Sequence, residues 1–156
     1  MDYEPFDTIA QVAAAFAGFV GVILAIRSRG GALPRLQMAG FLLTSLGAVA
    51  FALLPQFFLG ILTNEKTAWQ LLCGLFGLYH LWVFIYYLVK HKDLRKMALV
   101  QKSISISSVP VIGLKLAAGS GFLLDHALSI YHLGLLWLVG VSIFFFSQIL
   151  LDEGHA

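Results

Sequence analysis

Four long apolar runs limit what this chain can fold into. They cover residues 6–26, 36–62, 68–89 and 127–151, and a helix needs about 20 mainly apolar residues to cross the roughly 30 Å hydrocarbon core of a bilayer. Only 12% of the 156 residues are charged and 60% are apolar, whereas about a quarter of an ordinary soluble domain is charged. A water-soluble monomer is excluded because it would expose large apolar patches. We therefore predict an all-α integral membrane protein.

A fifth segment, residues 104–124, is harder to assign. Its ten strongly apolar residues contribute about −0.3 to −0.6 kcal/mol each to insertion, and the central Lys115 costs about +2.5 to +3.5 kcal/mol, so with Pro110 and the serines the sum is near zero. If the segment did not span, it would form a long apolar loop, which is unusual. The prediction is a transmembrane helical bundle with five spans in a single domain over residues 1–156. The alternative is four spans plus a re-entrant segment at 104–124.

The positions of the basic residues predict the orientation. With five spans, eight of the ten lie on one side, Lys66 lies on the other, and Lys115 lies within the membrane. The eight are Arg27, Arg29, Arg35, Lys90, Lys92, Arg95, Lys96 and Lys102. By the positive-inside rule, the N-terminus is outside and the C-terminus cytoplasmic. The basic loop at 90–102 is expected to meet anionic lipid headgroups at about 1 kcal/mol per basic residue, rather than nucleic acid.

Small residues at four-residue spacing predict packing faces, because close backbone approach drives helix association in lipid. The first helix has Ala13, Ala17 and Gly21, and the second has Gly40, Thr44 and Ala48. These faces pack within the bundle or form the seam of a homo-oligomer. Local signals predict helix boundaries: Thr67 with Gln70 matches a capping box, Asp125 suits a cap for the fifth helix, and Pro55 is expected to bend or end the second.

Lys115 is the strongest candidate for a functional residue, because an ionisable group in mid-span usually faces a bundle interior or an aqueous cavity. Gln101, Ser108 and Lys115 share one helical face. Pro110, Gly119 and Gly121 are expected to interrupt this helix, and an interrupted hydrophobic segment is typical of a transport site. No Asp or Glu lies in a predicted hydrocarbon core. Lys115 is therefore neutral, binds a transient anion, or donates to backbone carbonyls freed by Pro110.

His80 and His132 are the other polar candidates within the spans. Each could line a pathway or make a packing hydrogen bond, and together they could ligate haem. Otherwise we expect no cofactor, no metal site and no catalytic residues. There is no Gly-x-Ser-x-Gly elbow, no cluster of carboxylates and no paired His spacing, so the chain is not predicted to be an enzyme.

Three stretches carry a family resemblance: AAAFAGFVGVILAIRSR at 13–29, SLGAVAFALLP at 45–55 and YHLGLLWLVGVSIFFFSQIL at 131–150. They resemble a group of small bacterial multi-spanning membrane proteins that have no assigned activity. The resemblance implies a bacterial inner membrane and assigns no functional residue.

These observations favour a homo-oligomeric channel or transporter-like pathway for a small anion. Lys115 would supply the charge, and His80, His132, Ser108 and Gln101 would line the pathway. Two alternatives remain open: an accessory subunit of a larger membrane complex, and a haem-binding electron-transfer protein.

Overall fold

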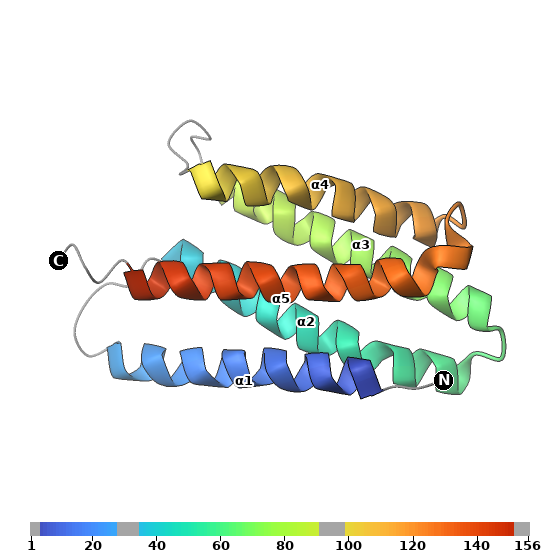
Figure 1. Cartoon of the computed structure of the whole chain (residues 1–156), viewed down its shortest axis with the longest axis horizontal. Coiled ribbons are helices and arrows are strands. Elements are labelled where there is room, and N and C mark those ends of the chain that lie inside the picture. The colour runs from blue at the N-terminus through green and yellow to red at the C-terminus, as the bar shows by residue number, and fades with distance from the viewer. Residues whose placement is uncertain (1–3, 28–34, 91–98, 152–156) are drawn as a thin grey trace. The chain divides into compact units, whose positions relative to one another are not determined.

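The computed structural model describes residues 4–27, 35–90 and 99–151. Within these ranges the chain is all-helical and contains no strand, as the sequence predicts. The helices are α1 (Glu4–Arg27), α2 (Arg35–Ile61), α3 (Glu65–Lys90), α4 (Leu99–Gly119) and α5 (Ala127–Leu151), with a one-turn 3-10 helix, η2 (Leu124–His126), before α5 (Figure 1).

Three helical stretches of the described chain are long and apolar enough to cross a membrane. They are Met38–Ile61, Glu65–Lys90 and Leu124–Gln148. The first two lie in α2 and α3, and the third runs from η2 through most of α5. The spans predicted for α1 and α4 stay predictions, as does the five-span bundle.

The distribution of side chains on α3 is the reverse of that in a water-soluble helix. Its exposed face carries large apolar residues, namely Leu71, Leu75, Leu78, Trp82, Ile85 and Val89. Its polar His80 is 4% exposed and lies on the opposite, buried face. In water the apolar stripe would face the core and the polar residues the solvent, so this arrangement is suited to lipid.

The chain forms two compact units, and α2 and α5 each contribute residues to both. Unit 1 comprises the residues up to Leu53 and those from Leu138 onward, and unit 2 comprises Leu54–Trp137. The single domain predicted over residues 1–156 stays a prediction.

In unit 1, the small-residue face of α2 packs against α5. Gly40, Thr44 and Ala48 are all buried, and a Cβ at Gly40 would lie 2.8 Å from the Phe145 ring. Ser142 Oγ donates to Thr44 Oγ1 at 2.9 Å, and the Thr44 hydroxyl donates in turn to the Gly40 carbonyl. This face is therefore used within the chain.

The small-residue stripe of α1 is buried only in part. Ala13 is buried, Ala17 is half-buried, and Gly21 is exposed. A Cβ added at Gly21 would meet no atom within 4 Å.

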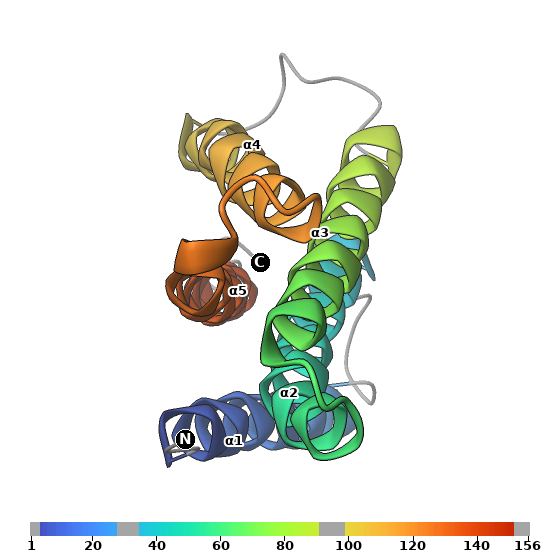
Figure 2. The same cartoon turned by 90° about the vertical axis from the view of Figure 1, so that its right-hand side faces the viewer.

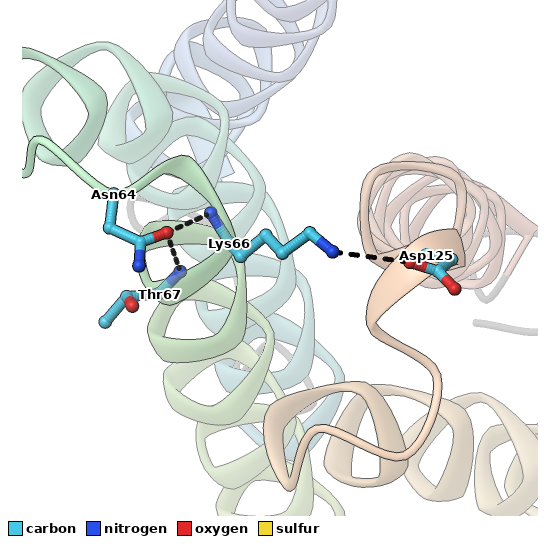
Figure 3. Close-up of polar contacts among 4 residues, drawn as sticks. All are labelled: Asn64, Lys66, Thr67 and Asp125. Atoms are coloured by element: carbon cyan, nitrogen blue, oxygen red, sulfur yellow. Dashed lines mark hydrogen bonds and ion pairs between the residues drawn. The ribbon is translucent and has the colours of Figure 1, made fainter.

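Helix α3 begins earlier than the predicted capping box implies. Asn64 Oδ1 accepts hydrogen bonds from the backbone N–H groups of Lys66 at 3.1 Å and Thr67 at 3.4 Å (Figure 3). An N-cap side chain satisfies N–H groups at these two positions of the first turn. The capping-box prediction is therefore wrong, because Asn64 is the cap and Thr67 already lies inside the helix.

The predicted cap of α5, Asp125, lies inside η2. Its carboxylate is 3.9 Å from Lys66 Nζ (Figure 3), and both side chains are well exposed. An exposed pair of this kind contributes little to stability. It does show that the loop before α5 lies at the end of unit 2 where α3 begins, so α4 runs antiparallel to α3 (Figure 2).

Helix α4 ends five residues before the predicted boundary at Leu124 and is not interrupted by Pro110. It ends because Gly121 adopts a positive φ of 91°. Gly121 N–H then donates to the Ala118 carbonyl, and Phe122 N–H to the Ala117 carbonyl, the pattern of a Schellman C-cap. Pro110 removes one backbone donor without breaking the helix, and the alternative of a re-entrant segment at 104–124 stays a prediction.

The prediction for Pro55 was likewise wrong in part. Helix α2 continues through Pro55 to Ile61, so the proline does not end it. Pro55 removes its own backbone donor, and the helix continues on both sides of it.

Candidate functional site

Glycines bring α3 and α4 into close contact in unit 2. A Cβ added at Gly119 would lie 2.6 Å from the Cα of Gly74, and one at Gly77 would lie 2.8 Å from a methyl of Leu116. Lys115 lies one turn before the end of α4, and not at its middle as predicted. The close approach of the two backbones turns Lys115 toward α3.

The Lys115 side chain is completely enclosed, with an exposed fraction of 0%. Its Nζ lies 2.9 Å from Nδ1 of His80 and 3.4 Å from the centroid of the Phe76 ring. Gly134 of α5 leaves room for it, because a Cβ there would overlap Lys115 Cε and lie 2.8 Å from Nζ. The site therefore draws on three helices, α3, α4 and α5.

The contact between Lys115 and His80 is a hydrogen bond between two basic groups. An ammonium has three donors and no acceptor, so when Lys115 is charged it donates to Nδ1 of a neutral His80, whose own proton is then on Nε2. The alternative role predicted for Lys115, donation to carbonyls freed by Pro110, is wrong, because its hydrogen-bond partner is His80.

No acidic residue in the described part of the chain pairs with Lys115. The described carboxylates belong to Asp7, Glu65 and Asp125, which lie in the first turns of α1 and α3 or in η2. The Lys115 ammonium would instead interact with the electron-rich face of Phe76, a cation–π contact that is stronger in a desolvated site.

Aromatic side chains support the Phe76 ring. Tyr131 packs edge-on against Phe76 at 5.1 Å and against Trp69 at 5.7 Å between ring centroids. Tyr131 is 0% exposed. Cys73 lies on the same buried face of α3, and its Sγ donates to the Ala127 carbonyl at 3.5 Å. The site thus has a closely packed wall from α3 and α5.

The other predicted liners do not join Lys115. Ser108 is buried, but it accepts a hydrogen bond from Trp137 Nε1 at 3.2 Å and lies about 10 Å along α4 from Lys115, at 1.5 Å per residue. His132 is half-buried, and neither Lys115 nor His80 bonds to it. Gln101 belongs to α4, but its side chain lies outside the described residues.

Sequence reasoning found Lys115 and His80 separately but missed Phe76 and Gly134. Phe76 and His80 are four residues apart, so helical spacing could have placed them on one face. Gly134 has no such signal, because its role depends on where Lys115 reaches from another helix.

Two further predictions concern ligands. Among the described residues no group of three or more His, Cys, Asp or Glu side chains could hold a metal ion. His80 already bonds Lys115 through Nδ1, and haem binding stays a prediction. Most of the basic loop predicted to meet lipid headgroups, residues 91–98, lies outside the described residues.

No family model, curated protein or solved structure matches this chain.

Proposed function

We propose that this protein is an integral membrane transporter for a small anion, with Lys115 as the binding charge. One observation carries the proposal: a lysine that is 0% exposed lies between three helices, and none of the described carboxylates pairs with it. Ionisable residues within membrane segments commonly mark ion pathways. A positive charge in this site would be stabilised by a bound anion.

If Lys115 only joined two helices, its burial would cost more free energy than a contact between neutral groups. Elsewhere the chain joins helices through neutral groups, as Ser142 does with Thr44 and Trp137 with Ser108. Burying an ionised group costs several kcal/mol, whereas a buried hydroxyl carries no such cost when it is hydrogen-bonded. The use of a lysine and a histidine here therefore supports a role in which charge is used.

The proposal treats α4 as a membrane span although its mean hydropathy is low. Its exposed face carries Ile106, Val109 and Leu114, whereas Ser108 and Lys115 are buried. Two of the polar residues that weaken the hydropathy signal are thus turned away from lipid. With this helix included, the basic residues favour an external N-terminus and a cytoplasmic C-terminus, and we place the protein in a bacterial inner membrane.

The enclosed site favours a transporter over an open channel. Because Lys115 is not exposed, an anion can reach it only when the helices of unit 2 move apart, and a transporter exposes its site in this alternating manner. The contacts described for Lys115 lie within one chain, and the homo-oligomer expected from the sequence stays a prediction.

Flux measurements in liposomes test the proposal. Purified protein is reconstituted with chloride as the probe, and chloride uptake is compared between the parent, Lys115→Met and Lys102→Met. Lys102→Met is the matched control, because it removes a lysine of the same helix outside the site. We expect Lys115→Met to reduce uptake to that of protein-free liposomes and Lys102→Met to retain it. Equal uptake by the parent and Lys115→Met, or none by the parent, would contradict the proposal.

A further inference from the structure

The Lys115–His80 pair holds at most one positive charge. A hydrogen bond at 2.9 Å between Nζ and Nδ1 needs one donor and one acceptor, and two cations in contact would have neither an acceptor nor any electrostatic gain. The pair is therefore either neutral or singly protonated. Each transition between these two states moves one proton.

The faces packed around the pair supply no opposite charge. On the buried face of α3 the other titratable group is Cys73, α5 carries Tyr131 and His132, and the one carboxylate of α3, Glu65, lies in its first turn. The thiol donates to the Ala127 carbonyl. Thiols and phenols are neutral near pH 7 in their ordinary state, so neither Cys73 nor Tyr131 offsets a charge on Lys115.

The charged lysine has one unused donor. One N–H of the ammonium is taken by Nδ1 of His80, and a second faces the Phe76 ring. Nζ makes no other hydrogen bond among the described residues. A buried ammonium with a free donor and no counter-charge is destabilised by several kcal/mol. An anion bound at the third N–H would supply both the hydrogen-bond acceptor and the negative charge.

We infer that a proton and a monovalent anion occupy this site together, one proton for each anion. The inference rests on the proposed function and specifies its energy source. In the empty site the amine of Lys115 and the imidazole of His80 are both neutral. One proton and one anion convert the amine to an ammonium paired with the anion, so the net charge does not change. Release of both on the other side restores the neutral pair, and transport is electroneutral and driven by the pH gradient.

Parallel measurements of chloride and proton uptake test this coupling. Proteoliposomes hold equal potassium inside and outside with valinomycin, which sets the membrane potential to zero, and the external solution is made acidic. A pH dye inside the vesicles reports protons, and a chloride-sensitive dye reports the anion. We expect chloride and protons to enter in a 1:1 ratio. A potential imposed with a potassium gradient at equal pH should not drive chloride uptake.

The outcomes separate the coupling from the proposed function. Chloride uptake that requires Lys115 but follows the membrane potential, with no proton movement, overturns the coupling and leaves the transporter in place. If chloride uptake is absent or does not depend on Lys115, the proposed function is overturned as well.

A second variant tests whether the coupled proton belongs to Lys115. Lys115→Arg carries a permanent charge, because the guanidinium is not deprotonated in proteins. It should support exchange of chloride for chloride but lose proton-linked net uptake. Retained proton-linked uptake in this variant would overturn the assignment to Lys115. If the variant does not fold, the 1:1 ratio in the parent still decides the inference.

Discussion

Lys115 Nζ and His80 Nδ1 lie 2.9 Å apart although the two residues are 35 positions apart in the sequence. Both side chains are buried, and the hydrogen bond between them offsets part of the free energy lost when each polar group leaves water. Removal of one partner leaves a buried polar atom unpaired, whereas replacement of both by apolar groups leaves none.

This dependence predicts non-additive effects on stability. His80→Leu and Lys115→Met should each lower the free energy of unfolding by about 1–3 kcal/mol, because each leaves a buried polar group without its hydrogen-bond partner. The double variant should lose clearly less than the sum. Unfolding by denaturant in mixed micelles measures all three, and additive losses would show that the two groups do not interact.

Gly134 is predicted to be intolerant of any side chain while Lys115 is present. Gly134→Ala should destabilise the protein by about 1–3 kcal/mol, the usual cost of overpacking, because the new Cβ overlaps Lys115 Cε. Gly140→Ala is the control on the same helix, since a Cβ there meets nothing within 4 Å. The loss at Gly134 should shrink when Lys115→Ala is added. A loss that is unchanged in that background would mean that Lys115 does not occupy this space.

The contact between α3 and α4 should depend on Gly119. A Cβ there would lie 2.6 Å from Gly74 Cα and 2.7 Å from Gly74 N, and backbone atoms cannot rotate away as a side chain can. Gly119→Ala should therefore lower the thermal midpoint of the detergent-solubilised protein. Gly113→Ala, on the same helix in open space, should leave the midpoint unchanged or raise it. Equal behaviour of the two variants would contradict this packing.

Two buried serines of unit 1 should respond in opposite directions. Ser45 Oγ has no hydrogen-bond partner among the described residues, so Ser45→Ala should stabilise the protein by about 1 kcal/mol by removing an unpaired hydroxyl. Ser142→Ala removes the bond to Thr44 and should cost about 0.6 kcal/mol, the average for such bonds between membrane helices. Chemical unfolding of both variants checks the signs, and a loss on Ser45→Ala would reveal a partner for that hydroxyl.

Helix positions could be predicted more accurately from the sequence than helix ends. The four apolar runs correspond to α1, α2, α3 and α5, because hydropathy is summed over many residues and tolerates local errors. The ends depend on single side chains and backbone angles. Asn64 caps α3 in place of Thr67, and the positive φ of Gly121 ends α4 before Leu124.

The site could be predicted only in part. Lys115 and His80 each stand out as polar residues in apolar helices, but their spacing gives no sign that they meet. The interruption expected at Pro110 did not occur, so a broken α4 does not support a transport site. The enclosure of Lys115 among three helices now supports it.

By itself, the sequence determined that this chain forms long helices suited to lipid, since hydropathy and helical length are properties of consecutive residues. Only the tertiary structure decided what Lys115 contacts, because that depends on where separate helices meet. The glycines at 74 and 119 let α3 and α4 approach closely, and Gly134 leaves space on α5. Together they direct the lysine side chain to His80 and Phe76.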